Sequence, residues 1–186
     1  MAVSFGDKTT MARCLNNIAF GFCELNLPDS SFKYSMNALT LSQQIGDKYL
    51  AGFAMRTLGD VYFTRKEYDA ALENFSECLK IARVEGNTFL KVSTLHRLGR
   101  IYAAMGYPER AIRFLKENIE VAELFGYKEE LERTYKLISE IYASGKDVAQ
   151  AYYYLSKYIV IHDSLSGQRQ NEKMLLMQSH LNAEIK

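Results

Sequence analysis

A five-residue motif returns along the chain at a step of 40 residues. Residues 58–62 read Leu-Gly-Asp-Val-Tyr, and residues 98–102 read Leu-Gly-Arg-Ile-Tyr. Weaker copies occupy residues 18–22 and 138–142, at the same step. A fixed period of this length is typical of stacked supersecondary units, in which each unit buries its apolar face only against its neighbours. The chain is therefore expected to fold as an array of about four similar units.

Each unit has the apolar pattern of two helices. In the second unit, Phe53, Leu58 and Val61 follow helical spacing, a break is expected at residues 65–66, and a second apolar stripe follows. Within this second stripe, a small residue is followed four positions later by a large one, a pattern that lets paired helices approach closely. The pairs are Ala71 with Phe75, Ala111 with Leu115, and Ala151 with Leu155, whereas the first unit has Ser31 with Ser35.

Four glycines mark the same register. Gly6, Gly46, Gly86 and Gly126 stand 40 residues apart, where the second helix of a unit is expected to end. Glycine is suited to such a place because it adopts the left-handed conformation at low cost. Three of the next residues are good helix caps, namely Asp7, Asp47 and Asn87, and Tyr127 interrupts this pattern.

These columns resemble the tetratricopeptide repeat. Leu58, Gly59, Tyr62, Ala71 and Phe75 match the consensus spacing of that family, and the next unit repeats the match. The step of 40 is similar to the long repeats of kinesin light chains, spindle-orientation adaptors and bacterial signalling proteins. HEAT and armadillo repeats have similar periods but lack these columns. The resemblance implies an all-α, right-handed superhelical solenoid of antiparallel helix pairs, with an extra C-terminal helix.

The register divides the chain into three parts. Residues 1–7 are expected to be the tail of a helix from a preceding, truncated repeat, and residues 8–167 to form four helix pairs. Residues 168–186 are expected to form a further capping or connector helix, because apolar residues recur there every three or four positions. This division predicts a segment of a longer protein. The alternative is a short protein with its own capping helix.

Composition narrows the possible partners. The formal net charge of +1 argues against strong nonspecific attraction to nucleic acid or membranes. No apolar run is long enough to span a membrane, so we expect no membrane insertion. The three cysteines are odd in number and show no Cys-x-x-Cys spacing, which favours reduced thiols in a cytoplasmic protein.

The family resemblance also implies where a ligand would bind. The first helices of such units line a concave groove, and we expect an extended peptide to lie there, held through acidic or carboxylate groups. The predicted groove residues are Arg13, Asn16, Arg56, Asp60, His96, Arg100, Arg133, Lys136 and Glu140. An alternative interpretation is that these are ordinary solvated residues of surface ion pairs.

Nothing in the sequence indicates catalysis. No phosphate-binding glycine loop and no nucleophile motif occurs. His96, His162 and His180 are far apart and lack metal-ligand spacing, so no metal and no cofactor are expected.

The leading hypothesis is a non-catalytic scaffold that binds a protein or peptide. A second hypothesis rests on residues 158–165, which resemble the exit segment of bacterial repeat modules that precede a histidine kinase, diguanylate cyclase or adenylate cyclase domain. The chain would then be a sensory region, with homodimerisation through its C-terminal helix.

Overall fold

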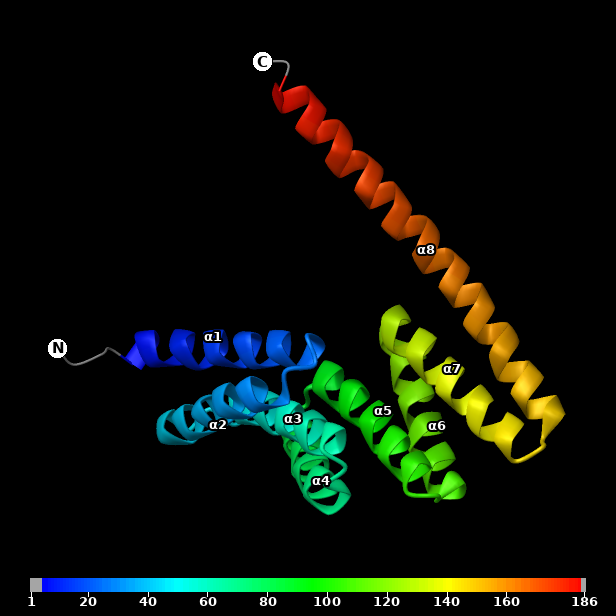
Figure 1. The fold of residues 1–186 in the computed structure, drawn as a ribbon, viewed down its shortest axis with the longest axis horizontal. Helices are drawn as coiled ribbons and strands as arrows, with labels where there is room; N and C mark the ends of the chain where they lie inside the picture. The colour runs from blue at the N-terminus through cyan, green and yellow to red at the C-terminus, as the bar shows by residue number, and fades with distance from the viewer. Residues whose placement is uncertain (1–4, 185–186) are drawn as a thin grey trace. The chain divides into compact units, whose positions relative to one another are not determined.

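The structure is a computed structural model that describes the backbone of residues 5–184 and the side chains of residues 7–177. Residues 5–184 form helices joined by short turns, and consecutive helices pair in antiparallel fashion (Figure 1). The predicted all-α class is confirmed. The helices are α1 Phe5–Glu24, α2 Pro28–Ile45, α3 Lys48–Thr64, α4 Tyr68–Val84, α5 Thr88–Ala104, α6 Pro108–Phe125, α7 Lys128–Ser144 and α8 Val148–Glu184.

The chain divides into two compact units, Met1–Val121 and Ala122–Lys186. The first contains α1 to α5 and most of α6, and the second contains α7 and α8. We call α1, α3, α5 and α7 the first helices of their pairs, and the others the second helices.

The glycine of the repeated motif, Gly59 in one pair and Gly99 in the next, lets the two helices of the pair come close. A Cβ atom added to Gly59 would collide with the ring of Phe75, and one added to Gly99 would lie 2.5 Å from Cγ of Leu115. Both Phe75 and Leu115 are fully buried. The missing side chains of Gly59 and Gly99 therefore make room for Phe75 and Leu115 in these two helix pairs.

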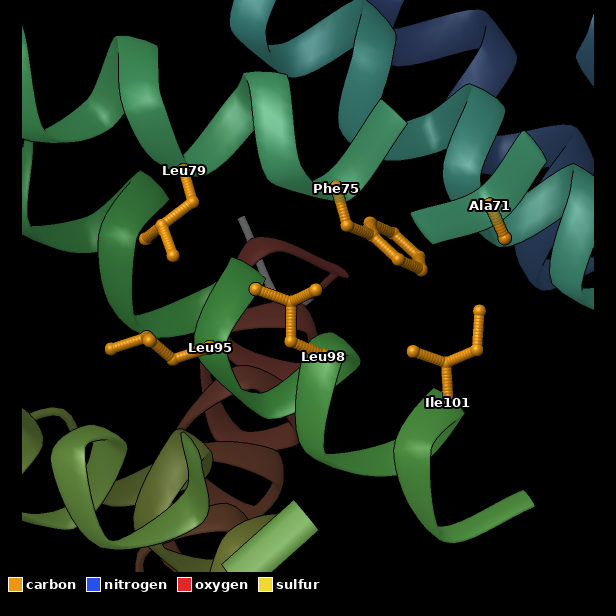
Figure 2. Packing of buried hydrophobic residues seen from close by; sticks show 6 residues of the cluster. All are labelled: Ala71, Phe75, Leu79, Leu95, Leu98 and Ile101. Carbon is orange, nitrogen blue, oxygen red and sulfur yellow. The ribbon is translucent and has the colours of Figure 1, made fainter. Parts of the chain in front are cut away.

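Successive repeats are joined by an apolar layer between α4 and α5. Ala71, Phe75 and Leu79 on α4 pack against three buried residues of α5, namely Leu95, Leu98 and Ile101 (Figure 2). Burial of apolar surface of this kind stabilises a repeat array mainly through contacts between neighbours.

The turns between repeats follow the glycine column. Gly46, Gly86 and Gly126 adopt positive φ angles of 72°, 66° and 72°. The side chains of Asp47 and Asn87 cap α3 and α5 by accepting hydrogen bonds from the backbone N–H groups of residues 50 and 90, at 2.9 and 2.8 Å. Tyr127 provides no side-chain cap for α7, as the sequence indicates.

The first glycine of the column behaves differently. α1 begins at Phe5, so Gly6 lies within this helix and Asp7 lies in its first turn rather than at a cap. Gly6 therefore does not end a preceding helix. Residues 1–4, which belong to the predicted tail of a truncated repeat, lie outside the described residues, and the division at residue 7 stays a prediction.

The turns inside the pairs show a regularity that the sequence conceals. Asn26, Lys66, Gly106 and Lys146 stand 40 residues apart, and all four have positive φ angles, between 55° and 82°. Non-glycine residues adopt this conformation uncommonly. Only the break at residues 65–66 was predicted, because the residue type in this column varies.

α8 corrects the predicted boundary at residue 168. The segment is helical as expected, but it continues α8 without interruption through Gly167 and extends beyond α7 (Figure 1). The early part of α8 packs on α7, where the ring of Tyr154 stacks on Tyr142 with centroids 5.7 Å apart. Leu165 is also buried. Leu181 and Ile185 of the predicted apolar stripe lie outside the described side chains.

Candidate functional site

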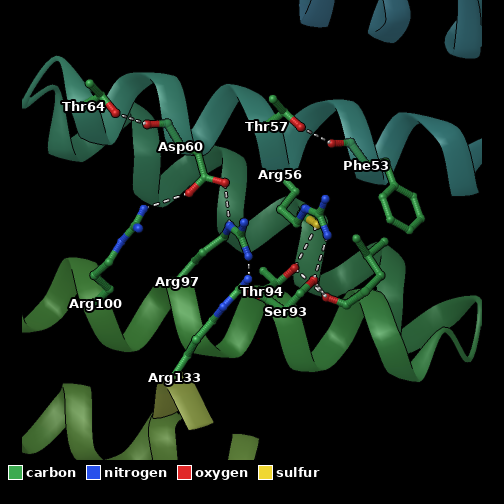
Figure 3. Close-up of polar contacts among 12 residues, drawn as sticks. Phe53, Arg56, Thr57, Asp60, Thr64, Ser93, Thr94, Arg97, Arg100 and Arg133 are labelled. Carbon is green, nitrogen blue, oxygen red and sulfur yellow. Dashed lines mark hydrogen bonds and ion pairs between the residues drawn. The ribbon is translucent and has the colours of Figure 1, made fainter. Parts of the chain in front are cut away.

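Three arginines and one aspartate gather on the first helices of the first unit. Asp60 of α3 accepts a hydrogen bond from Nε of Arg97 at 2.6 Å and another from Nη2 of Arg100 at 2.8 Å, both from α5 (Figure 3). Arg56 of α3 donates from Nη1 to the hydroxyl of Ser93 at 3.1 Å. We call Arg56, Asp60, Arg97 and Arg100 the arginine cluster.

Helical geometry and the repeat period together place these residues. Arg56 and Asp60 are four residues apart on α3, and Arg97 and Arg100 are three apart on α5, so each pair shares a helix face. Asp60 and Arg100 occupy the same position in successive repeats, and stacking brings these positions side by side. Arg97 is oriented by a second bond, from Nη1 to the backbone oxygen of residue 93 at 2.9 Å.

Aromatic rings support two of the guanidinium groups. The Arg56 guanidinium lies 5.0 Å from the ring centroid of Phe53 and 5.7 Å from that of Phe20. The Arg100 guanidinium lies 4.2 Å from the ring centroid of Phe63. Such cation–π contacts stabilise the arginine. They leave the N–H groups at the edge of the planar guanidinium available to other acceptors.

Burial differs across the cluster. Asp60 and Arg97 are buried, whereas the side chain of Arg100 keeps 38% of its surface exposed. Burial lowers the pKa of Arg100, although the nearby Asp60 carboxylate opposes this effect. The buried Nε atom of Arg100 has no hydrogen-bond partner in the structure. Arg100 is therefore both accessible and incompletely satisfied.

The structure brings together some of the predicted groove residues and separates others. Arg56, Asp60 and Arg100 meet in the arginine cluster, and His96 lies half-buried on α5. Asn16 is buried on α1, where its amide nitrogen donates to the backbone oxygen of residue 50 at 3.0 Å. Arg13 is exposed on α1.

Three predicted groove residues lie in the second unit. Arg133, Lys136 and Glu140 are all exposed on α7. Arg133 lies 3.6 Å from the carboxylate of Glu130, one turn earlier. The alignment of these side chains with those of the first unit stays a prediction.

Sequence reasoning missed Arg97, the most buried arginine partner of Asp60. Arg97 directly follows the predicted groove position at His96 and lies among buried apolar residues, which include Leu95 and Leu98. A charged residue inside an apolar stripe is a signal for a buried partner. That signal could have pointed to Asp60, which lies on the neighbouring first helix.

A second polar cluster joins the two helices of the second unit. Glu132 of α7 lies 2.6 Å from Nδ1 of His162 and 3.2 Å from Nη2 of Arg169, both on α8. Burial alone would raise the pKa of Glu132, but the hydrogen bonds from His162 and Arg169 outweigh it, so the pKa is lower than usual. This cluster holds α8 against α7 on both sides of Gly167.

The lowered pKa of Glu132 predicts a pH dependence. A carboxylate with a lower pKa in the folded chain contributes stability that is complete above the ordinary glutamate pKa and is lost as the pH falls below it. Urea unfolding of the wild-type chain and of Glu132→Gln should therefore differ most near neutral pH. The difference should shrink in acid, and a difference that grew in acid would contradict the assigned hydrogen bonds.

Other features of the structure give weaker support for a binding site. An open hollow of about 520 Å³ lies at the turn between α2 and α3, bordered by Gly46, Lys48 and Glu85, away from the arginine cluster. Among the side chains of residues 7–177, no group of His, Cys, Asp and Glu is placed to hold a metal ion. No helix in the described part of the chain is long and apolar enough to cross a membrane.

Two family models match the sequence, and both describe the tetratricopeptide repeat. One covers residues 10–83 and the other residues 92–127, which together are more than half of the chain. The sequence matches no curated protein.

Solved structures share the fold at low sequence identity. Aspartyl phosphate phosphatase F from Bacillus subtilis is 19% identical with a TM-score of 0.80, over 86% of this chain and 42% of that one. A signal transduction ATPase with a tetratricopeptide repeat sensor, from Pyrococcus horikoshii, is 20% identical with a TM-score of 0.72, over 88% and 26%. A putative kinesin light chain from Podosopora anserina is 11% identical with a TM-score of 0.54, over 82% and 95%. The chain thus spans less than half of the first two proteins.

Proposed function

The chain belongs to the tetratricopeptide repeat family, and on this premise we propose that it is a non-catalytic scaffold that binds an extended, acidic peptide. Domains of this family generally bind proteins or peptides on the surface that their stacked repeats create. The proposed binding surface is the face of α1, α3 and α5 that carries the arginine cluster, Arg13 and His96.

The observation that carries the proposal is the gathering of three arginines around one aspartate in the arginine cluster. Arg97 and Arg100 both donate to the carboxylate of Asp60, and Arg56 donates to the hydroxyl of Ser93. Arginine is well suited to carboxylate recognition because its planar guanidinium can donate two parallel hydrogen bonds.

Among the three arginines, we expect Arg100 to make the main contact with the peptide, because its side chain is accessible. Its side chain is partly exposed and its guanidinium is held over Phe63, so little conformational freedom remains to be lost on binding. Arg97 is buried and acts by keeping Asp60 in position. Exposed Phe20 lies beside Arg56 and offers an apolar contact next to the charged one.

The test is selection from a display library of random peptides. Peptides selected by the wild-type chain should be enriched in Asp and Glu. Their affinity for the variant Arg56→Gln/Arg100→Gln should fall about tenfold or more, since a hydrogen bond to a charged group contributes about 1.5–3 kcal/mol.

A matched control removes the same charge elsewhere. Arg110 and Arg113 are both exposed on the second helix α6, so Arg110→Gln/Arg113→Gln should leave the affinity unchanged. Thermal unfolding of both variants checks that they remain folded. Equal loss in both variants would indicate nonspecific attraction, and no acidic enrichment would refute the proposed site.

A second candidate function is favoured by α8. This helix continues without a break to Glu184, and Met174, Leu175, Leu176 and Met177 are all more than half exposed. A helix that extends past its partner and exposes such apolar residues could connect a sensory repeat region to an effector domain, or pair with a second copy.

A further inference from the structure

The last second helix, α8, leaves uncovered a face that is buried in the earlier repeats. Leu155 of α8 occupies the repeat position of Phe75 and Leu115, which are 0% exposed, yet Leu155 is 43% exposed. Ile159 occupies the position of Leu79 and is 49% exposed, against 5%. In α4 this face is covered by the first helix of the following repeat, α5.

The first helix, α1, also exposes residues at positions that are buried in the later first helices. Ile18 of α1 occupies the repeat position of Leu58 and Leu98, which are 2% exposed, yet Ile18 is 43% exposed. Cys14 is also exposed, although Thr94 at the same position of α5 is fully buried. In α5 this face is the one that packs on the preceding second helix, α4.

We propose that copies of this chain stack head to tail, with α8 of one copy packing against α1 of the next as α4 packs against α5. This self-association goes beyond peptide binding and does not depend on it. The α4–α5 layer supplies the template, because α8 carries apolar residues at all three positions of its α4 half and α1 carries them at two of the three positions of its α5 half.

The residue types fit a second copy as the occupant. α8 carries Ala151, Leu155 and Ile159 where α4 carries Ala71, Phe75 and Leu79, and all three α8 residues are apolar. On the receiving helix, Leu15 and Ile18 stand where α5 has Leu95 and Leu98. The third residue of the α5 half, Ile101, has Gly21 at its place on α1, so the receiving face has less apolar surface there.

This contact joins two different surfaces, so it does not close on itself in a dimer. Heterologous contacts produce rings or open filaments, in which each copy uses both of its ends. The average molar mass should therefore rise with protein concentration beyond that of a dimer.

The first experiment blocks one end at a time. Ile18→Asp removes the α1 face, and Leu155→Asp/Ile159→Asp removes the α8 face. Analytical ultracentrifugation should find each variant monomeric, because neither has two matching ends. An equimolar mixture should form one-to-one dimers and nothing larger, since each variant retains the end that the other lacks.

The second experiment tests the register of the contact. Sγ of Cys78 on α4 lies 3.1 Å from the hydroxyl of Thr94 on α5. Two repeats further on, Tyr158 holds the position of Cys78, and two repeats earlier Cys14 holds that of Thr94. The variant Tyr158→Cys, oxidised with diamide, should therefore form disulfide-linked oligomers through Cys14 of the neighbouring copy.

Two controls accompany this cross-link. The double variant Tyr158→Cys/Cys14→Ser should not form the oligomers, because the receiving thiol is missing. Tyr152→Cys places a thiol on a different, exposed part of α8 and should give at least tenfold less product.

Three results would overturn the proposal. The first is a wild-type chain that stays monomeric at every concentration, which would mean that the two faces do not bind one another. The second is a dimer that survives Ile18→Asp and needs the α8 face, which would indicate symmetric α8 pairing. The third is association that disappears when residues 168–186 are removed, which would favour pairing through the extended end of α8 and the sensory function.

Discussion

Replacing Asp60 by alanine is expected to destabilise the folded chain by about 3–5 kcal/mol, the cost of breaking a buried ion pair by removing one partner. Asp60 and Arg97 are buried together at 2.6 Å, with side chains 7% and 10% exposed. Without the carboxylate, Arg97 would be left as a buried cation next to Arg100. Urea unfolding monitored by circular dichroism measures the loss.

Two further variants test whether the loss of stability in Asp60→Ala comes from the buried charge of Arg97. Asp29→Ala removes a carboxylate that also contacts an arginine, Arg65, at 2.6 Å, but Asp29 is 94% exposed. Exposed pairs contribute little, so its unfolding free energy should stay near that of the wild type. Adding Arg97→Met to Asp60→Ala should recover part of the lost stability. Equal effects of Asp29→Ala and Asp60→Ala would contradict the buried cluster.

Replacing Gly99 by alanine is expected to lower the free energy of unfolding by about 1–3 kcal/mol, the usual cost of overpacking a well-packed interior. The added Cβ atom would lie 2.5 Å from two side-chain atoms of Leu115, which is fully buried and has little room to move. The two helices α5 and α6 would have to separate locally.

Gly21 provides the matched control within the same chain. It also lies inside a first helix, but a Cβ atom there would meet nothing within 4 Å. Gly21→Ala should stabilise the chain by about 0.5–1 kcal/mol, because alanine loses less conformational entropy in a helix. Thermal unfolding of both variants should show shifts of opposite sign. Shifts of the same sign would argue against the close approach at Gly99.

The repeat register could be predicted because it rests on local chemistry. The glycine turns at residues 46, 86 and 126 and the caps at Asp47 and Asn87 depend on residue type and helical geometry alone. The exception, Gly6, has the right residue type but lies inside α1. A glycine permits a left-handed turn without requiring one, so the match in sequence was insufficient there.

The candidate site was only partly predictable. Arg56, Asp60 and Arg100 follow from the register, since equivalent positions on stacked first helices lie next to one another. Arg97 does not, because its pairing with Asp60 joins two different repeat positions, 37 residues apart. Which arginine is buried depends on the packing of neighbouring helices rather than on spacing within one helix.

The sequence by itself determined the period, the helix pairs and the glycine turns between repeats, because these depend on short-range spacing that repeats along the chain. Tertiary structure alone decided the pairing of Asp60 with Arg97 and the continuation of α8 through Gly167. A glycine inside a helix costs only about 1 kcal/mol. A glycine therefore ends a helix only where the following segment folds back and packs against that helix. Whether it does so depends on contacts between residues distant in sequence.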